Sequence, residues 1–466
     1  MKKRKNILLF LVLSLILFSL SCSITTSAPI PDNTSTLATM VALTVEAAIG
    51  VQPTEAPSDA PPAIVPTEII APPLLVRPSA LTVAYVKNGN VHVWVEGGTS
   101  VALTNSGDAI QVSISSDGQL IAYLRQIPVG SFIYELWVVN TTLPTNERLL
   151  ISHAELEALK ALSSFPTAQG LSFSQILWRP GTHQLAYGTV PQFEGPGYAP
   201  NEDIRLVNVD TLEKATLFDF GQGGHFSFAP DGTKIVFSTP DHISLANADG
   251  SNLHPNVVSF PVVGTYSEYQ YHPSPIWAPD SASLRVAIPP EDTLAEPTPP
   301  TNLWSIPSDG SPATLLGNIS AVPFAWPDSA FSPGLPRVAY VKSIGGPTEN
   351  QRELHIANTD GSNDIIFASG TNIRFHMWTP DSTRFVYSLN EENDRGLYLA
   401  KTTGEISTIT SEQNTVNQMQ WVDNSRFLYI YRKDSTWQLS ISDVDGTNHA
   451  YLDPQVGEYT SFDFAK

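Results

Sequence analysis

A short turn motif that recurs seven times constrains the fold of this chain more than any other feature. Six of the seven turns carry Asp at the second position, and six follow an aromatic residue. Short apolar segments follow the turns, so the pattern predicts a series of β-hairpins. The turns are Ser116-Asp117-Gly118, Pro180-Gly181-Thr182, Pro230-Asp231-Gly232, Pro279-Asp280-Ser281, Pro327-Asp328-Ser329, Pro380-Asp381-Ser382 and Val422-Asp423-Asn424.

A second set of turns lies farther along several of the units. It includes Asp249-Gly250, Asp309-Gly310, Asp360-Gly361 and Asp445-Gly446. Each unit therefore contains four short strands and spans about 40 to 60 residues, a repeat typical of a β-propeller. The aromatic residues before the first set predict packing between the strands, because they recur at one structural position. They are Trp178, Phe228, Trp277, Trp326, Trp378 and Trp421.

The Trp-x-Pro-Asp-(Gly/Ser) turn followed by a short apolar strand resembles the TolB-like β-propeller repeat. It is also similar to the propeller domains of the dipeptidyl peptidase IV type. The resemblance covers most of residues 81–466 and implies an all-β fold, a single propeller of four-stranded blades. TolB carries an α/β domain before its propeller, where this chain has a Pro-rich segment, so a Tol-Pal role does not follow.

The seven turns predict seven complete blades, and the ends of the segment predict an eighth. Thr82–Val86 and Val91–Val95 read as the second and third strands of a unit without its first strand, which Tyr459–Phe464 would supply. Pairing the C-terminal strand with the N-terminal blade would close the ring and remove exposed sheet edges. We predict eight blades, with seven as the alternative.

The N-terminus has the pattern of an exported lipoprotein. A basic run, Lys2 to Lys5, precedes an apolar run from Ile7 to Leu20, which is short for a membrane span. The segment Ser19-Leu20-Ser21-Cys22 resembles a bacterial lipoprotein cleavage box, so residues 1–22 are predicted to be a signal peptide and Cys22 the lipidation site. An ordinary signal peptide or an uncleaved anchor is the alternative. The resemblance implies an extracytoplasmic protein anchored to the membrane of the cell envelope.

Residues 23–80 have a different composition, in which Pro, Thr, Ala and Ser dominate. Such a segment buries too little apolar surface to fold alone, so we predict a mostly disordered tether. The domain organisation is then a leader (1–22), a tether (23–80) and a propeller (81–466).

The predicted loops are unequal on the two faces of the propeller. Loops from the second to the third strand, and from the fourth strand to the next blade, carry the long insertions 151–172, 189–202, 259–272, 290–301 and 343–352. We call this side the insertion face. Irregular loops on a rigid scaffold often bind partners, and Tyr suits recognition. The candidate contact residues are Phe193, Tyr198, Tyr266, Tyr269, Tyr271 and His272. Tolerated surface insertions are the alternative interpretation.

No catalytic motif, cofactor motif or metal motif is visible in the sequence. Gly-x-Ser-x-Gly, the P-loop, the Rossmann glycines and His-Glu-x-x-His are missing, and the Asp-Gly turns lack the ligands of a calcium loop. Single histidines such as His225 and His376 are interpreted as structural. We therefore predict no catalytic residues, no cofactor and no metal.

The net charge of −20, from 45 acidic and 25 basic side chains, argues against nucleic-acid binding. We predict a monomer that binds a protein, peptide or glycan at the cell envelope through the insertion face. The alternative is a propeller hydrolase or lyase whose acidic site lies in the central channel or on that face. Its candidate residues are Glu194, Glu202, Asp203, Glu268 and Glu291.

Overall fold

The computed structural model describes residues 78–466, except residues 144–145, 194–201, 267–269, 298, 322–330, 335, 347–348, 391–394, 411–415, 434 and 445–448. These residues belong to the second of two units, Ala71–Lys466. The predicted leader, the lipidation site Cys22 and most of the predicted tether therefore lie outside the described residues. Within the described part, no helix has the length and apolar character needed to cross a bilayer.

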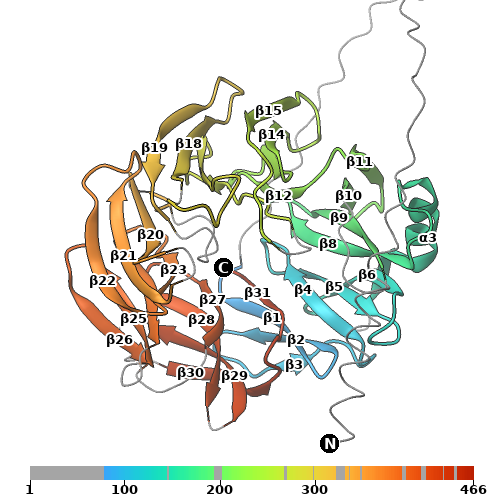
Figure 1. Ribbon diagram of the computed structural model, residues 1–466. Coiled ribbons are helices and arrows are strands. Elements are labelled where there is room, and N and C mark those ends of the chain that lie inside the picture. The colour runs from blue at the N-terminus through green and yellow to red at the C-terminus, as the bar shows by residue number, and fades with distance from the viewer. Residues whose placement is uncertain are drawn as a thin grey trace, which may run out of the picture. The chain divides into compact units, whose positions relative to one another are not determined.

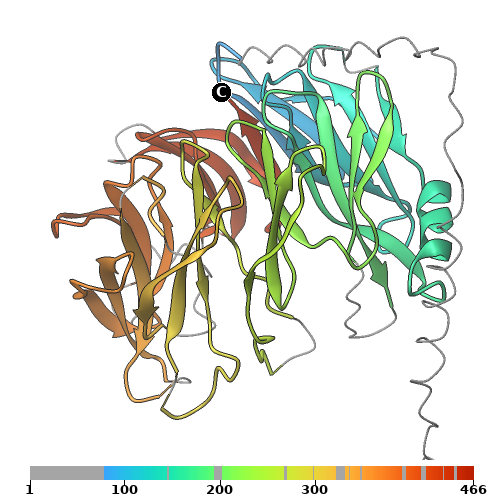
Figure 2. The same cartoon turned by 90° about the horizontal axis from the view of Figure 1, so that it is seen from above.

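Eight antiparallel sheets stand around a central axis as the blades of a β-propeller (Figure 1). We number the blades 1 to 8 in chain order, and seven of them have four described strands. Seen from above, the sheets stand side by side with their faces toward one another (Figure 2). The predicted all-β propeller is confirmed.

The first four blades contain the N-terminal half of the propeller and the C-terminal strand. Blade 1 consists of β31 (Phe462–Ala465), β1 (Thr82–Lys87), β2 (Asn90–Val95) and β3 (Val101–Ala102). Blade 2 consists of β4 (Ala109–Ile114), β5 (Leu120–Gln126), β6 (Tyr134–Asn140) and β7 (Arg148–Ile151). Blade 3 consists of β8 (Gly170–Trp178), β9 (Gln184–Gln192), β10 (Ile204–Asn208) and β11 (Lys214–Phe218). Blade 4 consists of β12 (His225–Phe228), β13 (Lys234–Ser238), β14 (His242–Asn247) and β15 (His254–Ser259).

The other four blades follow in the same order. Blade 5 consists of β16 (Ile276–Trp277), β17 (Ser283–Ile288), β18 (Thr301–Pro307) and β19 (Thr314–Ile319). Blade 6 consists of β20 (Arg337–Ser343), β21 (Gln351–Asn358) and β22 (Ile365–Thr371). Blade 7 consists of β23 (Arg374–Trp378), β24 (Arg384–Asn390), β25 (Arg395–Lys401) and β26 (Ile406–Thr410). Blade 8 consists of β27 (Val416–Trp421), β28 (Arg426–Lys433), β29 (Thr436–Asp443) and β30 (His449–Val456).

The ring closes through a blade built from both ends of the propeller. Strand β1 pairs with β2 on one side and with β31 on the other, with Thr82 opposite Ala465 and Tyr85 opposite Phe462. The prediction of eight blades with a composite first blade is confirmed. The alternative of seven blades is wrong, because the end segments together supply one more sheet.

Blade 6 has three described strands where the repeat predicts four. At the position of its first strand, Phe331 makes an isolated antiparallel bridge with Val338. The predicted turn Pro327-Asp328-Ser329 and Trp326 lie outside the described residues.

The hydrophobic core lies between neighbouring blades, and buried apolar clusters occur at all eight junctions. Trp178 and Trp378 are buried within two of these clusters. The indole of Trp178 in blade 3 donates to the Ser113 carbonyl in blade 2, at 3.1 Å. Trp277 in blade 5 donates to the Ser227 hydroxyl in blade 4, also at 3.1 Å. The repeated aromatic residue therefore attaches its blade to the preceding one, which confirms the packing role for these residues.

The recurrent turns are held by their own side chains and backbone. The Asp231 carboxylate accepts from the backbone N–H of Thr233 at 2.9 Å, and Asp381 accepts from Thr383 at 3.0 Å. The third position has a positive φ in four of the described turns, at Gly118, Gly232, Ser281 and Ser382. These local contacts support the interpretation of the Asp residues as turn formers.

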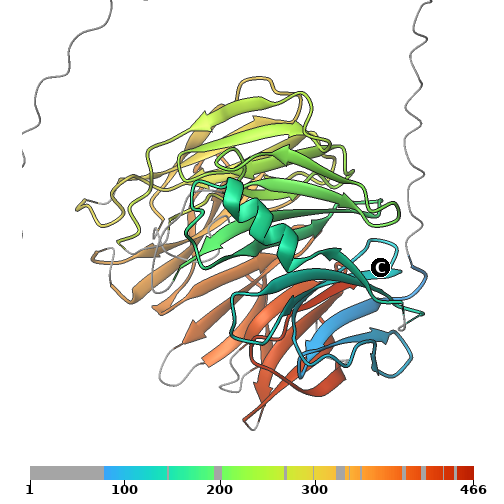
Figure 3. The ribbon, with the colours of Figure 1, turned by 90° about the vertical axis from the view of Figure 1, so that its right-hand side faces the viewer.

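One α-helix is described, α3 (His153–Leu162), and it lies in the first insertion of the chain. Ser152 and Glu155 form a capping box at its N-terminus. Leu156 is fully buried in the cluster between blades 2 and 3. Figure 3 shows the helix on the outer side of the ring.

A matched pair of glycine substitutions tests the turn geometry. Gly232 and Gly97 both have positive φ, of 69° and 84°. A Cβ at Gly232 would lie 2.5 Å from the Pro180 carbonyl oxygen, whereas one at Gly97 would meet nothing within 4 Å. We expect Gly97→Ala to cost about 1 kcal/mol from backbone strain alone, and Gly232→Ala roughly 2–3 kcal/mol. Urea denaturation of the two variants measures the difference, and equal midpoints would contradict the close packing of blades 3 and 4 at this turn.

Candidate functional site

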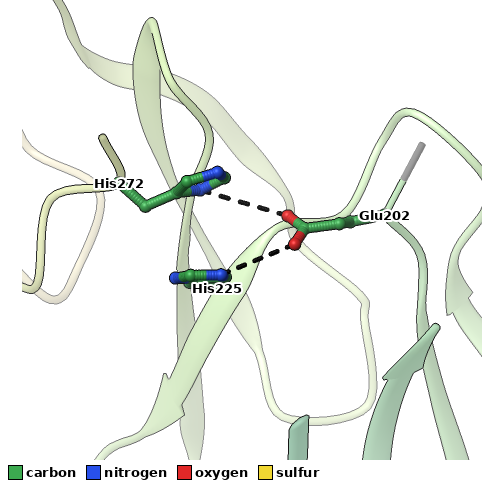
Figure 4. Close-up of side chains that lie close together, drawn as sticks. All are labelled: Glu202, His225 and His272. Atoms are coloured by element: carbon green, nitrogen blue, oxygen red, sulfur yellow. Dashed lines mark ion pairs between the residues drawn. The ribbon is translucent and has the colours of Figure 1, made fainter. Parts of the chain in front are cut away.

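Three side chains that could together bind a ligand converge on the insertion face (Figure 4). Glu202 lies just before β10 in blade 3, His225 begins β12 in blade 4, and His272 lies in the connection from β15 to β16. One ligand atom from each residue lies within 4.8 Å of the other two. Three separate loops of the insertion face therefore meet at one point.

The carboxylate of Glu202 faces both imidazoles. Its Oε1 lies 3.5 Å from His225 Nε2, and its Oε2 lies 4.0 Å from His272 Nδ1. The two rings are stacked, with centroids 4.1 Å apart and planes 20° apart. His272 Nδ1 lies 3.1 Å from the Ser238 carbonyl, which can only accept, so Nδ1 carries the proton. His272 Nε2 is then the nitrogen with the free lone pair.

A buried ion pair positions Glu202. The next residue, Asp203, is fully buried, and its Oδ1 accepts from the backbone N–H and the hydroxyl of Thr189 at 2.7 and 2.9 Å. Its Oδ2 accepts from Arg205 Nε. Burial raises the pKa of Asp203, while Arg205 and Thr189 act in the opposite direction. The backbone at Glu202 is therefore fixed by its neighbour.

Glycines allow the connection from β11 to β12 to pack closely against Glu202 and Asp203. The N–H groups of Gly221 and Gly223 both donate to the Glu202 carbonyl, each at 3.1 Å. A Cβ at Gly223 would lie 2.6 Å from the Asp203 carbonyl carbon, and one at Gly224 would lie 2.3 Å from the Ser238 carbonyl oxygen. Only glycine allows so close an approach, so Gly223 and Gly224 place His225 beside Glu202.

Hydrogen bonds between β8 of blade 3 and β12 of blade 4 fix the backbone of Phe226, the residue that follows His225. The side-chain amide of Gln175 in β8 donates to the Phe226 carbonyl at 2.9 Å and accepts from the Phe226 N–H at 3.1 Å. A pocket of about 370 Å³ adjoins this contact. It is lined by Ser174, Gln175, His225, Phe226, Ser227, Val236, Pro273, Ser274 and Pro275. Most of these residues come from β8, β12 and the segment before β16, so the pocket lies where blades 3 and 4 meet this segment.

The three side chains differ in exposure. The side chains of Glu202 and His272 are 15% and 11% exposed, and that of His225 is 55% exposed. Burial, with a smaller contribution from the Asp203 charge, raises the pKa of Glu202 to about 7. Desolvation lowers the pKa of His225 and of His272 below the usual range for histidine. The cluster therefore opens toward solvent on the His225 side and presents two neutral imidazoles at neutral pH.

The predicted contact residues lie on two connections, the one from β9 to β10 and the one from β15 to β16. Phe193 packs edge-on against Phe165, with ring centroids 5.7 Å apart. Tyr266 is 65% exposed, and Tyr271 is half-buried. His272 belongs to the cluster with Glu202, whereas Tyr198 and Tyr269 lie outside the described residues.

Three of the five acidic residues of the alternative hypothesis are among the described residues, and their surroundings differ. Glu202 belongs to the cluster with His225 and His272, and the Asp203 carboxylate forms an ion pair with Arg205. Glu291 is exposed, and Glu194 and Glu268 lie outside the described residues. Among the described residues of this set, Glu202 is therefore the one candidate that lies beside imidazole side chains.

The sequence analysis missed the pairing of His225 with His272. The three residues come from different connections and form no local motif, and His225 was interpreted as structural. The available signal was Gly223-Gly224 directly before His225, since paired glycines at a strand start indicate close backbone approach.

Replacing the buried anchor tests its role in positioning Glu202. Asp203 and Asp219 both contact Arg205, but the Asp203 side chain is fully buried and that of Asp219 is 68% exposed. We expect Asp203→Asn to lower the free energy of unfolding by about 3 kcal/mol. The matched Asp219→Asn change should cost less than about 0.5 kcal/mol, because exposed ion pairs contribute little. Thermal denaturation followed by circular dichroism compares the two, and similar melting temperatures would contradict the anchoring role.

No family model and no curated protein matches this chain. Solved structures match its fold. The propeller domain of the Trilobed protease from Pyrococcus furiosus is 12% identical with a TM-score of 0.45, over 74% of this chain and 97% of that one. Dipeptidyl peptidase 4 from Porphyromonas gingivalis is 12% identical with a TM-score of 0.49, over 80% and 57%. TolB from Acinetobacter baumannii is 16% identical with a TM-score of 0.30, over 59% and 70%. At these identities the likeness concerns the β-propeller fold alone.

Proposed function

We propose that this chain is an extracytoplasmic, lipid-anchored propeller that binds a protein, peptide or glycan partner through its insertion face. The observation that carries the proposal is the conformation of Tyr266. This residue has a φ of 53°, in the left-handed region that bulky side chains rarely adopt, and it is 65% exposed. Strained residues of this kind persist where the surrounding structure holds them, and they cluster at binding sites.

The contacts that hold Tyr266 join two insertions. Its hydroxyl donates to Asp292 Oδ1 at 2.5 Å, across to the loop between β17 and β18. Near Tyr266, the N–H of Gly264 donates to the Glu291 carbonyl at 2.7 Å, and the Gly264 carbonyl accepts from the Thr293 hydroxyl at 2.7 Å. The aromatic ring of Tyr266 is thus exposed while hydrogen bonds hold the loop that carries it. Because the loop is already ordered, it loses less conformational entropy when a partner binds.

The N-terminal sequence supports the membrane anchor. A single cysteine stands at the end of the apolar leader, and residues 23–80 have the composition of a tether. Acyl chains on Cys22 would hold the propeller at the envelope surface while the tether lets the insertion face reach its partner.

Substitution of Tyr266 tests partner binding. With a photoreactive phenylalanine analogue at position 266 of the full chain in intact cells, we expect a discrete cross-linked product. The same analogue at Leu143, which is 59% exposed in the turn between β6 and β7 on the opposite face, should give none. Tyr266→Ala should weaken binding of the cross-linked partner at least tenfold, because aromatic anchors dominate interfaces. Asp292→Ala, which leaves the ring in place, should have a smaller effect. Equal products at both positions, or unchanged binding by Tyr266→Ala, would contradict the proposal.

Replacement of the cysteine tests the anchor separately. We expect Cys22→Ser to abolish incorporation of a labelled fatty acid and to remove the protein from the acylated fraction, because the chain has no other thiol. Detergent phase partitioning of wild type and variant measures the change. Labelling that persists in the variant would contradict lipidation at this residue.

A propeller hydrolase or lyase is the second candidate function. The observation that favours it is the position of the Glu202 carboxylate, 3.5 Å from the His225 imidazole beside a pocket of about 370 Å³. At this separation the two groups lie slightly beyond hydrogen-bond distance, and a bound small substrate would have to bring them closer before they could transfer a proton. Turnover of a candidate substrate that is lost in Glu202→Gln but retained in Tyr266→Ala would favour the enzyme over the binding module.

A further inference from the structure

We propose that Glu202, His225 and His272 form a binding site for one divalent transition-metal ion of the zinc type. This inference goes beyond partner binding and does not depend on it, because the metal site can exist whichever molecule the insertion face recognises.

The donor set indicates the class of metal. Two imidazoles and one carboxylate suit Zn²⁺ and its neighbours in the first transition row. Calcium and magnesium prefer sites made of oxygen ligands alone, which this cluster does not supply. Three protein ligands also leave a coordination position for water or a group of a bound molecule.

The distances are compatible with binding after a small contraction. Zinc bonds to nitrogen and oxygen of about 2.0–2.2 Å, in tetrahedral geometry, place ligand atoms about 3.4 Å apart. Glu202 Oε1 and His225 Nε2 are already 3.5 Å apart, and one nitrogen of His272 lies within 4.8 Å of a ligand atom of each of the other two residues. Binding also requires the two stacked imidazoles to rotate about their side-chain bonds, because their planes are 20° apart and the lone pairs must point at one ion.

One hydrogen bond prepares His272 as a ligand. Its Nδ1–H donates to the Ser238 carbonyl at 3.1 Å, which fixes the tautomer and leaves Nε2 unprotonated. Metal-binding histidines commonly donate their second ring nitrogen to a carbonyl in this way. Ser238 is itself fixed, because its hydroxyl donates to the Pro273 carbonyl at 2.7 Å, next to His272.

The charge environment of Glu202 also favours a cation. Its side chain is 15% exposed, and among the described residues its ion-pair partners are the two imidazoles alone. The nearby Asp203 adds negative charge, and Arg205 is bonded to Asp203. A buried carboxylate without a strong cationic partner is costly, and a divalent ion would supply the compensating charge. The exposed side of His225, next to the pocket, provides the entry path.

Metal titration of the full chain in mild detergent, after removal of bound ions with a chelator, tests the proposal. By isothermal titration calorimetry we expect one Zn²⁺ per chain, and Co²⁺ should give the visible absorption of a four- or five-coordinate ion. His225→Ala, His272→Ala and Glu202→Gln should each weaken Zn²⁺ binding at least tenfold, because each removes a direct ligand.

The matched control is His242→Ala. His242 begins β14 in the same blade, also at the insertion face, and its Nδ1 lies 2.7 Å from Asp241.

X-ray absorption at the zinc edge of the wild-type chain provides a readout that does not depend on how the variants fold. We expect a spectrum with two imidazole ligands and one or two oxygen ligands. Failure of the wild-type chain to take up Zn²⁺ or Co²⁺, a spectrum without imidazole, or unchanged binding by a folded His225→Ala/His272→Ala double variant would each overturn the proposal. Loss of binding in His242→Ala equal to that in His225→Ala would do the same, since it would place the ion elsewhere.

Discussion

Apolar packing between neighbouring blades is the interaction on which the rest of this structure depends. Each sheet of a propeller presents two faces, and each face must be covered by the next sheet. Here buried clusters occupy every junction, including the one that the C-terminal strand completes. Each Å² of apolar surface removed from water contributes about 25 cal/mol, so the packing between the blades supplies the stability of the ring. The loops at the ends of the strands are then free to vary.

The ring also explains how residues distant in sequence come together. Glu202, His225 and His272 span 70 residues, yet each lies at a connection on the insertion face. His225 and His272 lie at equivalent connections, which lead from one blade to the next, whereas Glu202 lies at the connection from β9 to β10 within blade 3. The packing of neighbouring blades brings these three connections to one point. Two local features then position the side chains. The buried carboxylate of Asp203 fixes the backbone at Glu202, and the two glycines before His225 allow that strand to approach it closely.

The fold could be predicted from the sequence because its signals are local and repeated. Asp231 bonds to Thr233 two residues away, and Gly232 adopts a positive φ, so each turn is encoded within a few residues. The composite blade followed from counting strands at the two ends. The cluster could not be predicted in the same way. Whether Glu202 faces His225 depends on the rotation of one blade against the next, and no spacing in the sequence encodes that rotation. His272 was selected for its neighbouring tyrosines, although the structure groups it with a carboxylate.

One connection links the two features of the insertion face. The segment between β15 and β16 carries both Tyr266 and His272. It is attached to blade 5 where Gly264 bonds to Glu291, and to blade 4 where the Ser238 hydroxyl bonds to Pro273. Because the connection contributes only backbone groups to both attachments, they do not depend on those of its side chains that would contact a partner or an ion. Substitutions at Tyr266 should therefore leave the cluster in place, and substitutions at His272 should leave the exposed ring in place. This independence is what allows partner binding and metal binding to be separated by experiment.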